Sequence, residues 1–149
     1  MYIMKKACFI LLGWALMSFT AWEPDFNTAL KTAKEKHRYV LLNFSGSDWC
    51  GPCKRMHAEI FADKTFLAMA DSSLIMVNAD FPRNKKNQLG SEIRKQNEWL
   101  ADKYNPKGKF PFTLLLDADG KVIRSWDGLP NTTAAGFATE ISHICDAGK

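Results

Sequence analysis

The sequence predicts an α/β domain in which helices cover both faces of a central mixed β-sheet. Two short, continuous apolar runs, residues 39–44 and 74–79, are typical of strands that are buried on both faces. Helical sequence connects them, and a strand–helix–strand unit places its two strands parallel. Near the C-terminus, the turn at residues 117–120 joins two further strands, and so short a connection pairs them antiparallel.

The first half of the domain adds three helices to the two buried strands. Residues 25–37 repeat apolar side chains at helical spacing, and Asp25 is the candidate cap of this helix. After the strand and the polar loop 45–48, a second helical stretch extends to Phe61. A break follows, and a short helix over residues 65–70 leads into the strand 74–79.

The second half begins with a polar stretch, residues 80–90, which shows little periodicity and predicts a loop. Its basic side chains are expected to be solvated, and contact with an acidic partner is the alternative (Arg83, Lys85 and Lys86). Residues 91–104 then have the apolar spacing of a helix, and Ser91 is its candidate cap.

The C-terminal part predicts a β-hairpin followed by a helix. Its two strands span residues 112–117 and 122–126. The helix is expected to start at a cap formed by Asn131 or Thr132 and to end near residue 146. This part completes the predicted order α-β-α-α-β-α-β-β-α.

Residues 1–21 predict a signal peptide. Lys5 and Lys6 form a short basic region, and residues 7–22 are almost entirely apolar. This run is shorter than the roughly 20 residues that a membrane span needs, although an uncleaved membrane anchor is the alternative. The domain at 22–149 is therefore expected to be extracytoplasmic, in the periplasm or secreted, where disulfides form and persist.

Length and charge bound the possible partners. The chain has 149 residues, which suggests one domain and, in our expectation, a monomer. Its formal net charge is +4, and loss of two signal-segment lysines leaves about +2. Because no basic stripe accompanies this charge, we expect no nucleic-acid binding. Membrane contact is expected only through the N-terminal segment, if that segment is retained.

The cysteine count indicates a redox or metal protein. Cleavage of the signal segment removes Cys8 and leaves three cysteines, an odd number that argues against a disulfide-stapled scaffold. Cys50 and Cys53 form a close pair. Cys145 lies among apolar residues of the last helix, which favours a buried, inert thiol over a third redox centre.

The close pair suits thiol–disulfide exchange. Gly51-Pro52 between the cysteines fits a helix start, because proline has no N–H to lose there. At the N-terminus of that helix, unbonded N–H groups favour the thiolate of Cys50. Cys50 then attacks a substrate disulfide, and Cys53 resolves the mixed disulfide. Trp49 is expected to shield the site and to offer contact surface.

A zinc site is the main alternative for the pair. Cys50 and Cys53, with His57, His143 and Cys145, supply ligand types that zinc accepts. The sequence contains no second Cys-x-x-Cys, and a surface position explains His57 at least as well. We therefore expect no metal and no cofactor other than a redox-active disulfide between the two close cysteines.

The segment Trp49-Cys50-Gly51-Pro52-Cys53-Lys54 follows a buried strand, and Phe110-Pro111-Phe112-Thr113 opens another strand about sixty residues later. Together these motifs resemble thioredoxin over nearly the whole of 22–149. The Asp48-Trp49-Cys50 approach and the polar segment before residue 91 more narrowly resemble extracytoplasmic thioredoxin-like proteins, including the C-terminal domain of the membrane disulfide reductase DsbD. The resemblance implies a thioredoxin fold.

The resemblance also implies a substrate platform. Pro111 is expected to be cis and to face the cysteine pair, and the backbone of Phe110 to receive an extended substrate segment. From the sequence alone, Pro111 is only a proline at a strand start, where proline is tolerated. The expected substrate-binding residues are Trp49, Gly51, Pro52, Phe110 and Pro111.

One position departs from the resemblance. Thioredoxins carry a buried aspartate before the motif that moves protons at the second cysteine, and Asn43 occupies the matching place. The lysine that accompanies this aspartate matches Met76. Neither side chain titrates, so the proton of Cys53 is expected to go to water or to another group, with Glu59 a weak candidate.

We expect a thiol–disulfide oxidoreductase that reduces protein disulfides, because Gly-Pro between the cysteines resembles the reducing members of the family. Disulfide oxidase or isomerase activity is the first alternative. A thioredoxin-fold binding or chaperone module without turnover is the second. The expected partners are disulfide-containing protein substrates and a membrane electron donor.

Overall fold

The computed structural model describes residues 21–148, so the predicted signal segment lies almost entirely outside the described residues. Four strands form one mixed sheet in the order β2-β1-β3-β4. The strands are β1 (Tyr39–Ser45), β2 (Leu74–Asp80), β3 (Phe112–Leu116) and β4 (Val122–Asp127). β1 pairs parallel with β2 and antiparallel with β3, and β3 pairs antiparallel with β4. The predicted mixed sheet is confirmed.

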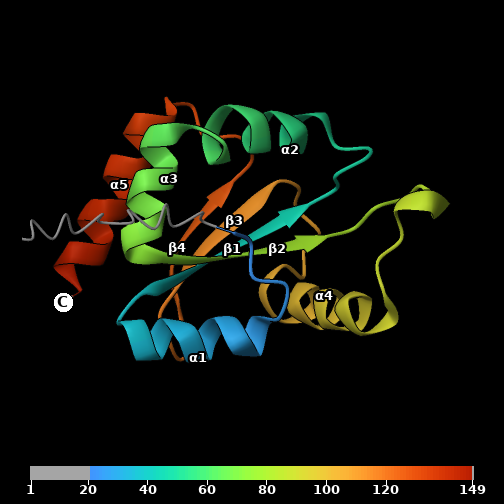
Figure 1. The fold of residues 1–149 in the computed structure, drawn as a ribbon. Coiled ribbons are helices and arrows are strands. Elements are labelled where there is room, and N and C mark those ends of the chain that lie inside the picture. The colour runs from blue at the N-terminus through green and yellow to red at the C-terminus, as the bar shows by residue number, and fades with distance from the viewer. Residues whose placement is uncertain (1–20, 149) are drawn as a thin grey trace, which may run out of the picture.

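Helices cover both faces of this sheet, as Figure 1 shows. One face carries α1 and α4, and the other carries α2, α3 and α5. The bounds are α1 (Phe26–Lys36), α2 (Gly51–Arg55), α3 (Lys64–Ser73), α4 (Ser91–Tyr104) and α5 (Ala134–Ala147). Within the described range, no helix is long and apolar enough to cross a membrane.

The core lies in two apolar layers, one on each face of the sheet. Successive side chains of a strand point to opposite faces, so Leu41 packs beneath α3 and α5 while Leu42 packs above α1 and α4. Phe66 of α3 stacks on Phe137 of α5 with ring centroids 6.1 Å apart. These layers fix the sheet that carries the cysteine motif at one end.

Several helix boundaries differ from the predicted ones. The side chain of Asp25 caps α1 as predicted, but Ser91 is the first residue of α4 rather than its cap. Thr133, not Asn131 or Thr132, caps α5 by accepting from the Gly136 N–H. Each correction moves a start by one or two residues, a distance over which neighbouring polar side chains compete for the same capping role.

The helical stretch after the cysteine motif changes its hydrogen-bond pattern. α2 is α-helical, whereas η1 (Met56–Phe61) continues it as a π-helix, in which Ala62 N–H bonds the carbonyl of His57. Such segments are frequent at functional sites. Asp63 then caps α3, which is longer at both ends than the predicted helix.

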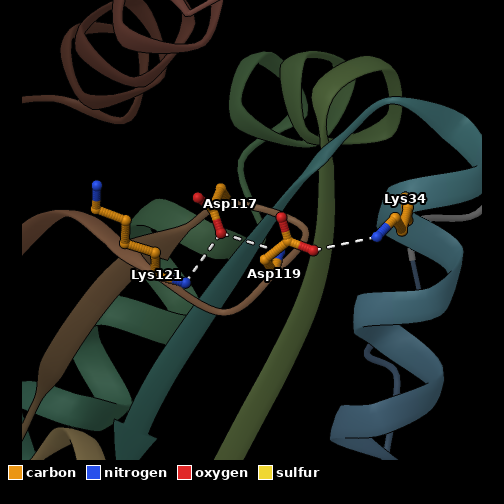
Figure 2. Close-up of polar contacts among 4 residues, drawn as sticks. All are labelled: Lys34, Asp117, Asp119 and Lys121. Carbon is orange, nitrogen blue, oxygen red and sulfur yellow. Dashed lines mark hydrogen bonds and ion pairs between the residues drawn. The ribbon is translucent and has the colours of Figure 1, made fainter.

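The β3–β4 turn is fixed by Asp117 and by α1. The Oδ1 atom of Asp117 accepts the N–H groups of Asp119 and Lys121, each at 2.9 Å (Figure 2). Lys34 of α1 reaches Asp119 in an exposed ion pair of 3.2 Å, worth at most about 1 kcal/mol. Gly120 has φ +80°, a conformation that favours glycine. The turn lies at the opposite end of β3 from Phe110 and Pro111.

Candidate active site

The cysteine pair forms the first turn of α2. Cys50 is the N-cap residue, and its Sγ atom accepts the Cys53 N–H at 3.3 Å. The two sulfurs are joined in a disulfide. Cys53 is fully buried and Cys50 is 5% exposed, whereas Gly51 and Pro52 between them are exposed. The arrangement presents Cys50, not Cys53, at the protein surface.

Trp49 lies in a closely packed aromatic site beside the disulfide. Its indole N–H donates to the Phe81 carbonyl at 2.8 Å, and its ring meets Phe110 edge-on at 5.4 Å. The Arg83 guanidinium lies 3.9 Å from the ring centroid. Gly46 allows this packing, because a Cβ there would overlap the indole. Trp49 is therefore held in place from three sides.

Phe110 and Pro111 meet this aromatic group from the start of β3. The peptide bond between them is cis, as the resemblance implies. Phe110 contacts Phe81 at 5.6 Å as well as Trp49. Pro111 is buried, and its carbonyl accepts the N–H of Gly128. The two segments that carry the resemblance thus lie side by side.

The predicted loop after β2 is tied to the cysteine motif. The carboxylate of Asp48 accepts the N–H groups of Arg83 and Asn84 and the side-chain amide of Asn87, at 2.8–3.0 Å. These hydrogen bonds, with the Arg83 N–H first, hold the pKa of Asp48 below its ordinary value. The three basic side chains of the loop are exposed as predicted, but Arg83 also covers Trp49.

Asn43 is completely buried beneath the motif. Its Oδ1 accepts from the Thr113 hydroxyl at 3.1 Å, and its Nδ2 donates to Asn78 Oδ1 at 3.0 Å. Its cross-strand partner on β2 is Asn78, while Met76 lies two residues away in the apolar core. The sequence analysis matched Met76 to this position and missed Asn78. The available signal was that Asn43 and Asn78 each stand two residues before the end of their strand.

His57 reaches the same polar network from η1. The Nε2 atom lies 3.3 Å from Asn43 Nδ2, and the ring packs against Trp22 and Phe61 at 5.3 Å each. Burial lowers the pKa of His57 despite the opposing influence of Asp80 and Asn78. The predicted surface position of His57 is wrong, because the side chain is half-buried.

Cys53 and His57 line one cavity of about 500 Å³, together with Ser45 and Asn78. Glu59 lies elsewhere, in an exposed bidentate pair with Arg55, which holds the pKa of Glu59 below its ordinary value. Glu59, the weak candidate for the proton of Cys53, does not line this cavity. His57 follows Cys53 by four residues, and this helical spacing was the sequence signal that the two side chains lie on the same side of the helix.

Cys145 lies on the buried face of α5, in the apolar core, and is 1% exposed. Among the described residues, no three His, Cys, Asp or Glu side chains gather where they could hold a metal ion. The ligand set considered for zinc is thus not assembled in the described part of the chain.

The family model of the thioredoxin-like domain matches residues 26–140. The disulfide bond reductase DsbH of Chlamydia pneumoniae is 36% identical over 114 residues, which cover 76% of this chain and 66% of the relative. The chain thus spans just under two thirds of that protein's length.

Two solved structures share the architecture. A DsbH oxidoreductase structure superimposes with a TM-score of 0.78 at 29% identity, covering 87% of this chain and 86% of that one. The oxidised C-terminal domain of DsbD from Neisseria meningitidis gives a TM-score of 0.54 at 20% identity, covering 78% and 90%. At that identity the second likeness concerns the fold alone.

Proposed function

Because this chain belongs to the thioredoxin-like family and has the thioredoxin fold, we propose that it is a thiol–disulfide oxidoreductase that reduces protein disulfides outside the cytoplasm. The observation that carries the proposal is the reactive pair itself. Cys50 and Cys53 are joined in a disulfide at the start of α2, beside a cis-proline segment and within reach of solvent at Cys50.

The position of Cys50 supports its role as the nucleophile. As the N-cap of α2, its sulfur faces backbone N–H groups that have no partner within the helix, and these groups stabilise a thiolate. The thiolate attacks a substrate disulfide, forms a mixed disulfide and releases one substrate thiolate. Cys53 then attacks the Cys50 sulfur, which forms the protein disulfide and releases the second substrate thiolate.

The surface around Cys50 suits a polypeptide substrate. Exposed Gly51 and Pro52, with half-buried Trp49 and Phe110, surround the disulfide and provide apolar contact area. Phe110 and Pro111 are joined by a cis peptide at the start of β3, and Phe110 contacts Trp49. An extended substrate segment would lie across these residues with its own disulfide over Cys50.

The compartment and the electron supply form part of the proposal. The apolar segment at 7–22 supports export of the domain. The segment is either cleaved as a signal peptide or retained as a membrane anchor, and the domain is extracytoplasmic in both cases. A reductase in an oxidising compartment needs an electron source, so we assign a membrane protein as the donor. The substrates are disulfide-containing proteins of that compartment.

The redox equilibrium of the pair with glutathione tests the direction of electron flow. A reductase should have a potential below about −200 mV, whereas strong disulfide oxidants lie near about −120 mV. The fraction oxidised is measured by thiol labelling and mass spectrometry. A value near that of the oxidants would replace the reductase proposal with the oxidase alternative.

A trapping experiment tests whether proteins are the substrates. The Cys53→Ser variant should accumulate mixed disulfides through Cys50 with exported proteins, because the resolving thiol is gone. The matched control is Cys50→Ser, which should trap nothing. If the Cys50→Ser, Cys53→Ser double variant retains full function, the protein is a binding module and not an oxidoreductase.

A further inference from the structure

We propose that His57 accepts the proton of Cys53 when Cys53 resolves the mixed disulfide on Cys50. The proposal rests on the proposed thiol–disulfide exchange. It assigns to a histidine the proton transfer that Asn43 cannot perform, because an amide side chain does not titrate.

Position supports this assignment. His57 follows Cys53 by four residues, so the two side chains project from the same side of the helical stretch one turn apart. Both line the cavity of about 500 Å³ behind the disulfide. Cys53 is otherwise fully buried, so the cavity gives its proton a path away from the sulfur.

The contact of His57 with Asn43 identifies which ring nitrogen is unprotonated. An amide N–H can only donate, so Nε2 of His57 accepts in its 3.3 Å contact with Asn43 Nδ2. The Asn43 amide is oriented by Thr113, which donates to Oδ1, and by Asn78, which accepts from Nδ2. This network holds a neutral imidazole, which is the form that can take up a proton.

The charges around His57 agree with a neutral base that can become cationic. The rings of Trp22 and Phe61 pack against the imidazole, and burial is the main cause that lowers the pKa of His57. The carboxylate of Asp80 and the side chain of Asn78 oppose this effect and stabilise the protonated ring. Lys54 also lines the cavity but is exposed to solvent.

Ser45 indicates how the proton crosses the cavity. Its hydroxyl is buried in the cavity wall and has no hydrogen-bond partner among the described residues. A buried hydroxyl without a partner costs free energy, and a cavity of this size that offers such a hydroxyl can admit water. A water bound to Ser45 would connect the thiol of Cys53 with the imidazole.

The nearby carboxylates, Glu59 and Asp80, are less suitable proton acceptors for Cys53 than His57. Glu59 is exposed and paired with Arg55. Asp80 receives two hydrogen bonds from Ser47, at 2.8 and 2.6 Å, and does not line the cavity. Among the titratable side chains that line the cavity with Cys53, His57 is the one that is half-buried and can be neutral near pH 7.

The proposed step balances. The Cys53 proton passes to the unprotonated ring nitrogen of His57, and the resulting thiolate attacks the Cys50 sulfur. The sulfur–sulfur bond between Cys50 and the substrate breaks as the bond between Cys50 and Cys53 forms. The substrate leaves as a thiolate, and His57 returns its proton to solvent or to that thiolate. In re-reduction by the donor, protonated His57 supplies the proton to Cys53.

Stopped-flow reaction with dithiobis(nitrobenzoate) tests the proposal on the reduced full chain carrying Cys8→Ala. Attack by Cys50 releases the first thionitrobenzoate at a rate that depends on probe concentration. Attack by Cys53 on the Cys50 sulfur releases the second thionitrobenzoate, at a rate that is independent of probe concentration. The variants are His57→Gln and, as the matched control, His143→Gln, which changes an exposed histidine on α5.

We expect His57→Gln to slow the second phase about tenfold or more at pH 7 and to leave the first within about twofold. The defect should shrink toward pH 9, above the ordinary thiol value of about 8.5, and His143→Gln should match the wild type. A second phase at the wild-type rate, or equal slowing of both phases, would overturn the proposal.

The wild-type protein provides a test that does not depend on a variant. The rate of its second phase should rise with pH, with an inflection well below the pKa of an ordinary thiol, about 8.5. A rate that rises only with an inflection near 8.5 would contradict the role of His57. A wild-type protein that shows both phases but reduces no protein disulfide would refute the proposed function and leave the His57 result standing.

Discussion

At the scale of single residues, the environment of His57 depends on side chains that are distant in sequence. Asn43, Asn78 and Thr113 come from three strands, and Trp22 comes from the segment before α1. The sequence identified Asn43 as a departure and Cys53 as the resolving thiol. It could not place His57 between them, because the π-helical turn and the contacts with Trp22 and Phe61 exist only in the folded chain.

The stability of the oxidised protein should report the environment of His57. Its pKa is lowered in the folded state, mainly by burial, from the ordinary value of 6.5. The unfolded chain therefore binds more protons in this range, so the contribution of His57 to stability is complete above pH 6.5 and is lost as pH falls through the folded pKa.

We expect the wild type to lose more stability than His57→Gln between about pH 7 and pH 5, measured as the free energy of unfolding in urea at successive pH values. His143→Gln provides the control and should follow the wild type. Parallel curves for the wild type and His57→Gln would show that the folded protein does not disfavour the imidazolium.

At the scale of elements, the side chain of Asp48 ties residues 83–87 of the loop after β2 to the cysteine motif. Asp48 satisfies two backbone N–H groups and one side-chain amide of residues 83–87, and the loop in turn holds Arg83 over Trp49. The polarity of residues 80–90 predicted a loop, and most of this segment is one, although Asp80 ends β2 and η2 (Lys85–Asn87) is a short 3-10 helix. The polarity could not reveal this attachment, since the acceptor lies 35 residues earlier and looks like any polar loop residue.

Replacement of Asp48 by Ala should detach the loop from the cysteine motif. Faster amide exchange is expected for Arg83 and Asn84, with altered Trp49 fluorescence and loss of a cation–π contact worth about 0.5–1 kcal/mol. Hydrogen exchange with mass spectrometry measures the first effect. Asp102→Ala, at an exposed position on α4, is the control; unchanged exchange in Asp48→Ala would show that other contacts hold the loop.

At the scale of the whole molecule, the redox pair and the third cysteine belong to separate regions. The pair lies at the end of the sheet where α2 begins, while Cys145 is part of the core on the buried face of α5. Element order and strand direction were predictable because buried apolar runs and short turns leave few topologies. The lateral order of strands was not predicted, because it depends on contacts between faces that no local pattern records.

Replacement of Cys145 by Ala should affect stability but not redox activity. Removal of a buried sulfur is expected to lower the free energy of unfolding by about 1–2 kcal/mol, measured by urea denaturation, while reduction of a protein disulfide stays within about twofold of wild type. The reverse pattern, in which activity is lost with stability intact, would make Cys145 a third redox centre.

The sulfur that reacts with substrate is also the atom that caps α2. A thiolate accepts the Cys53 N–H more strongly than a disulfide sulfur does, because charge strengthens a hydrogen bond. We therefore expect the first turn of α2 to be held more tightly in the reduced protein than in the disulfide form. Reduction of the pair is therefore expected to strengthen the hydrogen bonding at the start of α2.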